Sequence, residues 1–403
     1  MTWAGWADEE RRRLVEANRW RTVRDLDGCG PAGVLLDGPV PRPVVSFASN
    51  DYLGLTHHPA VVAAAHGALD RWGAGAGAAR LTVGSRPVHS QLEGELAAWK
   101  AAERAALFPT GFAANLGVLS ALGVGGVTIL SDERNHASVV DGCRLARAHV
   151  IVYPHGDVGA VDRALRDAGR ALVVSDSVFS MDGDVAPVDD LAAVCRRHDA
   201  LLVLDEAHAV LGPDPSGPRP ALLRVGTLSK TLGSLGGFVA GPAPLVDLVV
   251  NRARPYIFTT ASSPADAAAA LAAVEVVRSP EGDVLRARLR RHVERIAPGH
   301  PTPIVPVVVG DEARAVAAAA ALLDQGLLVP AIRPPTVAPG TSRLRVTLSA
   351  AHTTEQVERL AAALAALVTA LRSTFVHEYP LLGGPVNKSR GSGGREGAGG
   401  AGP

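Results

Sequence analysis

Lysine is rare in this chain, and one lysine lies in a segment suited to covalent chemistry. The sequence holds three lysines against 37 arginines, and Lys230 is the only charged residue of Thr227-Leu228-Ser229-Lys230-Thr231-Leu232-Gly233. An amine forms a Schiff base with a carbonyl compound, which a guanidinium cannot do. The neighbouring Ser, Thr and Gly residues offer hydroxyls and close backbone approach to a phosphate. Lys230 is therefore the first candidate catalytic residue, with a solvated loop lysine as the alternative.

A second candidate group is Asp205-Glu206-Ala207-His208, which follows the apolar run 201–204. A carboxylate at the end of a strand can keep a pyridinium nitrogen protonated, which strengthens a pyridoxal ring as an electron sink. His208 lies three residues further on, where it can hydrogen-bond the phenolic oxygen of such a ring. For an isolated D-x-x-H pattern, a solvated turn is the alternative.

Three further segments place small or polar residues where a strand gives way to a helix or a turn. Thr110-Gly111 opens a helical pattern and can present free N–H groups to a phosphate, although Thr110 can also be an ordinary N-cap. His136 opens another helix and can stack on an aromatic ring, or have no such duty. Ser180 lies in a stretch rich in turn formers, which fits a site loop or simple turn chemistry.

The elements that must position these residues alternate between strand and helix. Short β-branched runs at 127–130, 150–153, 171–175 and 201–204 are separated by helical patterns at 137–147, 158–169 and 187–198. This alternation predicts crossover units and a mainly parallel sheet. Ligands of such sheets bind beyond the carboxyl ends of the strands, where Asp132, Asp176 and Asp205 are found.

The rest of the chain divides by composition. Residues 1–25 predict a charged helix and 28–43 a loop-rich connection. An Ala-rich helix is expected at 264–278, followed by a smaller α+β unit with helices at 283–296, 312–325 and 354–371 and strands at 304–309 and 343–348. The expected division is an N-terminal helix and connection (1–45), a large domain (46–282), a small C-terminal domain (283–372) and a disordered tail (373–403).

The overall composition excludes several classes of protein. A length of 403 residues with 47% apolar content allows a large core, and the zero net charge gives no general attraction to nucleic acid or to an anionic membrane. The three cysteines, Cys29, Cys143 and Cys195, are widely spaced, so neither a disulfide framework nor a metal site is expected. No secretory signal or apolar stretch long enough to span a bilayer is found, and the expected compartment is the cytoplasm.

Taken in chain order, these segments resemble the α-oxoamine synthase family of pyridoxal 5'-phosphate (PLP) enzymes, from about residue 20 to residue 371. The matching motifs are Ser49-Asn50-Asp51-Tyr52-Leu53-Gly54-Leu55, Gly111-Phe112-Ala113-Ala114-Asn115, His136-Ala137-Ser138, Phe179-Ser180-Met181-Asp182-Gly183-Asp184, Asp205-Glu206-Ala207-His208 and Thr227-Leu228-Ser229-Lys230. Within the family, Ile332-Arg333-Pro334-Pro335-Thr336-Val337 is most similar to the members that make 8-amino-7-oxononanoate. The connection from His208 to Lys230 is several residues shorter than is usual in the family.

The resemblance implies an α/β large domain of the PLP-dependent aminotransferase-like type (fold type I) and a smaller α+β C-terminal domain. It implies that Lys230 carries PLP as an internal aldimine, that Asp205 pairs with the ring nitrogen, and that His136 stacks on the ring. His208 then contacts the phenolic oxygen. The remaining implied cofactor-binding residues are Gly111, Phe112, Ser180 and Thr227. The implied substrate-binding residues are Asn50, His136, Arg345 for the amino acid carboxylate, and Thr336 and Arg21 for the acyl substrate, with Arg24 as a competitor of Arg21.

The reaction implied is a decarboxylative condensation of L-alanine with a pimeloyl thioester. Alanine displaces Lys230, the freed amine removes the α-proton, and the product is 8-amino-7-oxononanoate with CO2 and a free thiol, in biotin biosynthesis. The acyl carrier, coenzyme A or an acyl carrier protein, stays open, and a homodimer is expected. Two alternatives remain: another α-oxoamine synthase with a different amino acid or thioester, and a catalytically silent member that acts as a binding subunit.

Overall fold

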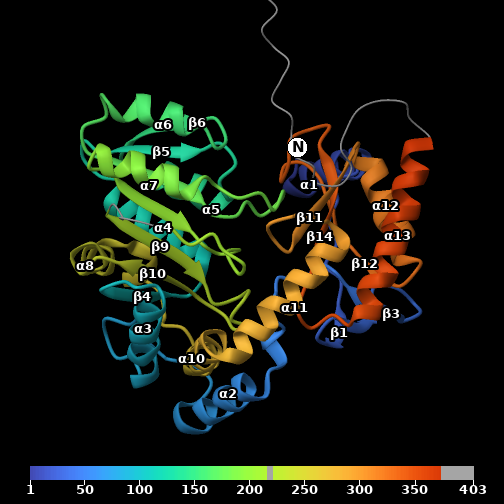
Figure 1. Cartoon of the computed structure of the whole chain (residues 1–403), viewed down its shortest axis with the longest axis horizontal. Helices are drawn as coiled ribbons and strands as arrows, with labels where there is room; N and C mark the ends of the chain where they lie inside the picture. Colours follow the sequence, from blue (N-terminus) through green and yellow to red (C-terminus); the bar gives the residue numbers. More distant parts are fainter. Residues whose placement is uncertain (216–220, 374–403) are drawn as a thin grey trace, which may run out of the picture.

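The computed structural model describes residues 1–215 and 221–373, which form two lobes with helix α11 (Pro280–Ile296) running between them (Figure 1). Within these residues, the large lobe contains a seven-stranded sheet of order β4-β10-β9-β8-β7-β5-β6. Its strands are β4 (Arg104–Phe108), β5 (Thr128–Asp132), β6 (His149–Tyr153), β7 (Ala171–Asp176), β8 (Leu201–Asp205), β9 (Leu222–Thr227) and β10 (Gly237–Gly241). The neighbours from β6 to β9 pair in parallel, and only β10 pairs antiparallel, with β4 and β9. The predicted mainly parallel sheet is confirmed.

Helices cover both faces of this sheet, which explains why its central strands are apolar throughout. Leu172 and Val174 of β7 pack in the cluster formed with α4 (Gly111–Leu122), α5 (Ala137–Leu145), α8 (Ala243–Arg252) and α9 (Arg254–Ile257). Val173, between them, packs on the other face against α6 (Val158–Leu165) and α7 (Val188–Arg197). The alternation fixes the register of each strand, and therefore which side chains emerge at its carboxyl end.

The second lobe contains the smaller α+β unit that the sequence predicts. Its three-stranded sheet has the order β11 (Ile304–Gly310), β14 (Ser342–Thr347) and β13 (Ala331–Ile332) within the described residues. Helices α12 (Glu312–Leu323) and α13 (Thr354–Ser373) begin where they were expected. The Ala-rich helix α10 spans Pro264–Arg278, as predicted, and leads into α11. The large lobe is completed by the turn η1 (Leu55–His57) and by α2 (Pro59–Trp72) and α3 (Pro87–Trp99).

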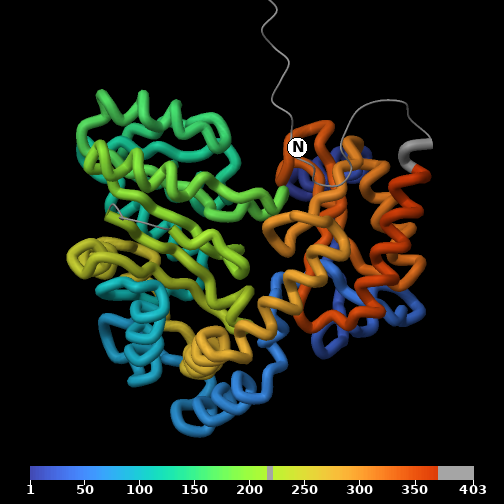
Figure 2. The backbone as a smooth tube through the Cα atoms, viewed as in Figure 1, coloured from blue at the N-terminus to red at the C-terminus, as the bar shows by residue number. Residues whose placement is uncertain are grey.

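The N-terminal segment differs from its prediction. Helix α1 covers only Trp3–Glu16, because Asn18 takes a left-handed conformation (φ 54°) and the chain then runs extended. The expected loop at 28–43 is wrong in part: strands β1 (Leu26–Cys29), β2 (Ala32–Leu35) and β3 (Arg42–Ser46) form here. Strand β3 pairs in parallel with β12 (Leu327–Leu328), so this blue segment lies with the orange and red C-terminal lobe (Figure 2).

Two sequence predictions concern the ends and surfaces of the molecule. The disordered tail predicted from residue 373 lies, beyond Ser373, outside the described residues. Among the helices of the described ranges, none combines the length and the hydropathy needed to cross a bilayer.

Candidate active site

Lys230 lies in the tight loop that joins β9 to β10. Backbone hydrogen bonds close this loop: the N–H of Leu228 donates to Gly236 O (2.9 Å) and the N–H of Ser234 to Leu228 O (2.9 Å). The Lys230 Nζ atom is 2.8 Å from His208 Nε2. Burial lowers the pKa of Lys230, and the charge of Arg345 adds to this, whereas Asp205 opposes it. A lysine in these surroundings is more often a neutral amine, the form that acts as nucleophile and base.

Asp205 is held rigidly at the carboxyl end of β8. Its Oδ2 accepts a hydrogen bond from Asn115 Nδ2 (2.6 Å), and its Oδ1 accepts one from the N–H of Ala207 (2.9 Å). Asn115, on α4, is buried and also donates to Ser138 Oγ (2.9 Å). The sequence identified Asp205 but gave no role to Asn115, which fixes the orientation of the carboxylate.

His208 lies between Lys230 and a buried phenol. Its Nδ1 is 2.5 Å from Tyr52 Oη, while its Nε2 faces Lys230. Burial lowers the pKa of His208 well below its ordinary value, and the charges of Lys230 and Arg345 contribute to the same shift. The imidazole is therefore neutral at physiological pH. Tyr52 was part of a recognised motif, yet its contact with His208 was not predicted.

His136 is the N-cap of α5 and lies near the same cluster. Its Nδ1 is 2.8 Å from Ser138 Oγ, and the ring of Phe112 stands edge-on to it with centroids 6.5 Å apart. Burial lowers the pKa of His136, and Lys230 adds to the shift while Asp205 opposes it. A neutral, flat imidazole is well suited to stack on an aromatic ring.

Asp176, at the end of β7, is a buried carboxyl group that the sequence noted only as a polar strand end. Its Oδ2 accepts the N–H of His136 (3.2 Å), and its Oδ1 is buried without a hydrogen-bond partner among the described residues. Burial raises the pKa of Asp176 well above its ordinary value, and the neighbouring Asp205 adds to the shift. Asp176 therefore places a buried carboxyl group next to His136.

The start of α4 forms a cradle for an anion. The first N–H groups of a helix have no intrahelical partner, and the cap of Thr110 engages only the third of them, at Ala113 (3.0 Å). A Cβ atom on Gly111 would lie 3.2 Å from Thr227 Cβ, so the glycine permits the close approach of Thr227 to the helix start. Backbone N–H groups, a helix dipole and a hydroxyl are the groups that hold phosphates in proteins. The cradle therefore fits the phosphate of PLP, with Lys230 and Asp205 near enough to meet the ring.

Arg345 brings the second lobe into the site. This buried residue of β14 donates from Nε to Ser180 O (2.6 Å), from Nη1 to Thr347 Oγ1 (2.9 Å) and from Nη2 to Asn50 Oδ1 (3.1 Å). Three predicted site residues, Arg345, Ser180 and Asn50, are thus brought together from separate parts of the chain. A fixed guanidinium of this kind can bind a carboxylate in bidentate fashion.

The loop that carries Ser180 is anchored by contacts at Gly183 and Asp184. His155 bridges Asp132 Oδ1 (3.0 Å) at the end of β5 and Asp184 Oδ2 (2.6 Å) in the loop. Although burial opposes it, hydrogen bonds to these two carboxylates raise the pKa of His155 to about 9. Gly183 has a left-handed φ of 67°, and a Cβ atom there would lie 2.0 Å from Ile304 O of the second lobe. Only glycine allows this close contact.

Arg21, Arg24 and Thr336 lie apart from this cluster. Arg24 pairs with Asp37 (3.4 Å), whereas Arg21 donates to Pro334 O (3.2 Å), two residues before Thr336. The geometry favours Arg21 over Arg24 as the residue that lies with Thr336. Among the described residues, no hydrogen bond or ion pair joins either arginine to Lys230 or Arg345.

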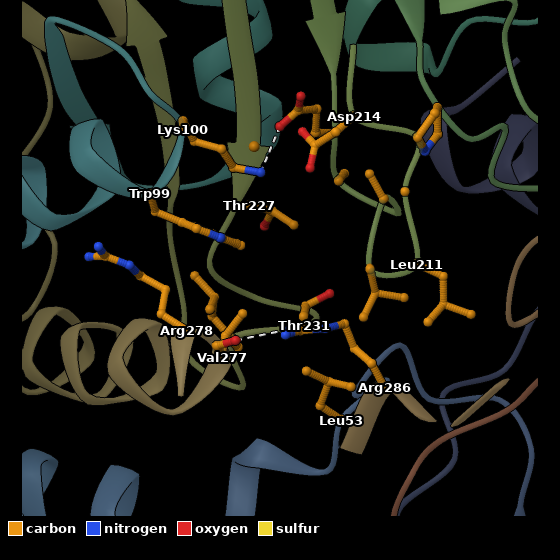
Figure 3. A pocket seen from close by; sticks show the side chains of 18 of the residues that line it. Leu53, Trp99, Lys100, Leu211, Asp214, Thr227, Thr231, Val277, Arg278 and Arg286 are labelled. Carbon is orange, nitrogen blue, oxygen red and sulfur yellow. Dashed lines mark hydrogen bonds and ion pairs between the residues drawn. The ribbon is translucent and has the colours of Figure 1, made fainter. Parts of the chain in front are cut away.

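A cavity of about 910 Å³ is lined by Thr227 and Thr231, which precede and follow Lys230 in the chain (Figure 3). Because successive residues after β8 point to opposite sides, Glu206 faces this cavity and pairs with Lys100 (2.8 Å). Its lining also includes Gly212, Pro213 and Asp214 of the short His208–Lys230 connection. The cavity therefore adjoins the candidate site without containing its reactive amine.

Comparison with known proteins places this geometry in a family. The family model described as aminotransferase class I and II matches residues 42–364. The chain is 50% identical over 372 residues to an 8-amino-7-oxononanoate synthase of Anaeromyxobacter dehalogenans, covering 86% of this chain and 92% of the relative. It is 46% identical to the Marinobacter nauticus protein of the same name, covering 93% and 99%.

Solved structures agree with this placement. The serine palmitoyltransferase of Sphingomonas wittichii superposes with a TM-score of 0.82 at 30% identity, covering 92% of this chain and 98% of that one. A variant of the S. paucimobilis enzyme with a bound PLP–myriocin aldimine gives 0.83 at 29% identity, covering 91% and 98%. The fold type I expectation is confirmed. The chain belongs to the aminotransferase class I and II family of PLP-dependent enzymes, and its curated relatives are 8-amino-7-oxononanoate synthases.

Proposed function

We propose that this chain condenses L-alanine with a pimeloyl thioester to give 8-amino-7-oxononanoate, CO2 and a free thiol, as a step of biotin biosynthesis. The observation that carries the proposal is the convergence of Lys230, Asp205 and His208, in a chain about half identical to synthases of that name. Alanine is proposed as the amino acid because those relatives are named for the product that alanine gives.

Lys230 is proposed as the residue that carries PLP covalently and, once released by the amino acid, as the base. PLP, when bound, supplies an electron sink for the electron pair left at Cα. The lowered pKa of Lys230 leaves Nζ free to accept the α-proton. His208, whose Nε2 is 2.8 Å from that nitrogen, stands beside the proton-transfer path.

Asp205 is proposed to hold the ring nitrogen, and His208 the phenolic oxygen. The two hydrogen bonds to Asp205, from Asn115 and Ala207, orient its carboxylate. His136 is proposed to cover one ring face as a neutral imidazole, and Ser180, whose carbonyl contacts Arg345, is proposed to help position the cofactor. Gly111 and Phe112, through their backbone N–H groups, and Thr227, through its hydroxyl, hold the phosphate.

Arg345 is proposed to bind the carboxylate of alanine with help from Asn50. Fixing this carboxylate decides which bond at Cα lies perpendicular to the ring and therefore breaks. Arg21 and Thr336 are proposed to meet the acyl substrate, because Arg21 lies against the segment that contains Thr336. Coenzyme A and an acyl carrier protein remain the two candidates for the carrier of the acyl group.

A homodimer is proposed on the basis of an exposed apolar surface. The segments 73–86 and 258–263 are joined by a hydrogen bond from Ala261 N to Ala78 O (2.9 Å). They expose Leu81, Val83 and Phe258, whose relative exposures are 52%, 75% and 70%. Large apolar side chains gathered in this way are typical of a protein interface. Sedimentation should give a dimer, and a pure monomer with full turnover would contradict this proposal.

The compartment and the domain division are also proposals. The cytoplasm is proposed because Cys29, Cys143 and Cys195 are all unpaired thiols, as is usual in a reducing compartment. The division into 1–45, 46–282 and 283–372 is retained, with the addition that strands β1 to β3 share a sheet with β12 of the C-terminal unit. Expression of 46–282 alone would remove β1, β2 and all of β3 except Ser46, together with the C-terminal unit that contains β12, and should therefore reduce solubility.

The reaction is tested with purified protein, PLP, pimeloyl-coenzyme A and, in separate reactions, alanine, glycine or serine. We expect a product with the mass of 8-amino-7-oxononanoate from alanine, and none with Lys230→Ala. Product from glycine or serine only would refute the choice of alanine while leaving the reaction type intact. Protein that absorbs in the visible but makes no product from any pair would refute the reaction itself.

A further inference from the structure

Tyr52 is a fully buried phenol whose oxygen contacts two residues of the candidate site. It is 2.5 Å from His208 Nδ1 and 3.2 Å from Asn50 Oδ1. Its ring packs in the main apolar core and stands edge-on to the His208 ring, with centroids 6.0 Å apart. The side chain therefore joins the core to the imidazole that faces Lys230.

The direction of the hydrogen bond between Tyr52 and His208 follows from the neighbouring groups. Burial raises the pKa of Tyr52 to about 12, so that the phenol keeps its proton. His208 is neutral and therefore has one N–H donor and one bare nitrogen. Asn50 Oδ1 already accepts a hydrogen bond from Arg345 (3.1 Å) and is the more distant acceptor for Tyr52. Tyr52 Oη lies closer to His208 Nδ1 (2.5 Å) than to Asn50 Oδ1 (3.2 Å), and a proton donated along the shorter contact leaves the proton of the imidazole on Nε2.

The position of that proton matters because Nε2 is the nitrogen that faces Lys230 Nζ, at 2.8 Å. Lys230 Nζ, the atom proposed to carry the cofactor, therefore lies next to an N–H donor in one tautomer of His208 and next to a bare nitrogen in the other. Only the first tautomer can donate to an anionic phenolic oxygen attached beside the cofactor aldehyde.

We propose that Tyr52 is a positioning residue that holds His208 in the tautomer with the proton on Nε2, and so makes this imidazole a permanent donor toward the cofactor. This inference rests on the proposed function, since it takes His208 as the partner of the phenolic oxygen. Tyr52 itself touches neither substrate nor cofactor in this role.

The test compares Tyr52→Phe with Tyr256→Phe in the full-length, PLP-loaded protein. Tyr256 is a matched control because it is buried and packs edge-on against Phe108, at 5.5 Å between centroids, in a different part of the large lobe. Three quantities are measured: the ¹⁵N NMR signals of His208, identified by their loss in His208→Asn; the visible spectrum at fixed pH; and kcat and KM for alanine.

In the wild type we expect a protonated Nε2 and an unprotonated, hydrogen-bonded Nδ1 on His208. In Tyr52→Phe we expect the Nδ1 signal to move, the visible band to shift, and kcat to fall about five-fold, the scale of one hydrogen bond, with KM for alanine within two-fold. Tyr256→Phe should match the wild type in all three. A merely structural role for Tyr52 would lower stability without moving the NMR signals or the band.

Three other outcomes would contradict either the inference on Tyr52 or the proposed function. A proton on Nδ1 in the wild type overturns the inference, and this measurement needs no variant to fold. Unchanged NMR signals and spectrum in a folded Tyr52→Phe protein overturn it as well. Absence of a visible band in the PLP-saturated wild type would instead refute the proposed function, which separates the two failures.

Discussion

Replacement of Asn115 by leucine removes a hydrogen bond that orients the Asp205 carboxylate. Asn115 is 1% exposed, and its Nδ2 lies 2.6 Å from Asp205 Oδ2. Leucine has nearly the same volume, so the change removes the donor without opening a cavity. A hydrogen bond to a charged group is worth about 1.5 to 3 kcal/mol, which corresponds to a factor of about 10 to 150. Since Asp205 is proposed to keep the ring nitrogen protonated, we expect kcat to fall by about this factor.

The assay measures kcat with alanine and pimeloyl-coenzyme A, together with the PLP content and the thermal unfolding of each variant. Asn135→Leu is the matched control, because Asn135 is also a buried asparagine but donates to Ser131 Oγ (3.0 Å) and Val174 O (2.9 Å) instead of Asp205. We expect that control to lose stability with a much smaller loss of kcat per bound PLP. If Asn115→Leu folds, binds PLP and keeps kcat within two-fold of the wild type, the assigned link between Asn115 and Asp205 is wrong.

Three further predictions concern the carboxylate site, the pH dependence and the loop around Ser180. Arg345→Lys keeps the charge but loses the planar fork, so KM for alanine should rise at least ten-fold in steady-state kinetics, and an unchanged KM would contradict the carboxylate role. His155 has a folded pKa of about 9 against 6.5 for the unfolded chain, so its stabilising contribution is fully present below pH 6.5 and is lost as the pH rises through 9. The difference in unfolding free energy between wild type and His155→Asn, measured by urea unfolding, should therefore shrink over that window. A difference that grows with pH would contradict this prediction. Gly183→Ala places a Cβ atom at a left-handed φ and against Ile304 O, so we expect at least about 2 kcal/mol of destabilisation and a lower Tm by calorimetry. An unchanged Tm would show that the loop can move aside.

The central sheet could be predicted from the sequence because its strands are buried on both faces. The apolar runs at 127–130 and 201–204 match β5 and β8 to within two residues. The N-terminal segment could not be predicted in this way. Its strands contain Gly and Pro, and β3 is stabilised by pairing with β12, whose Leu328 lies more than 280 residues after its partner Ser46. Local pattern carries no information about a partner so distant.

The residues of the candidate site also fall into two groups, those that a short motif identifies and those whose roles depend on contacts with distant residues. Lys230, Asp205 and His208 stand out because their residue types have a chemical reason to follow a strand, and the motifs around them are short and local. Asn115 and Tyr52 were inside recognised motifs, but their roles come from contacts with residues 90 and 156 positions away. Such roles depend on how α4 and the segment after β3 pack against the end of β8, which only the folded structure shows.

The account rests above all on the amine of Lys230 holding PLP, and reduction followed by peptide mapping tests this most directly. The full-length protein, saturated with PLP, is treated with borohydride, digested and examined by mass spectrometry. We predict a stable pyridoxyl adduct on the peptide that contains Lys230, and none there in Lys230→Ala. An adduct on Lys100 alone, or a Lys230 peptide that stays unmodified at full PLP saturation, would contradict the account.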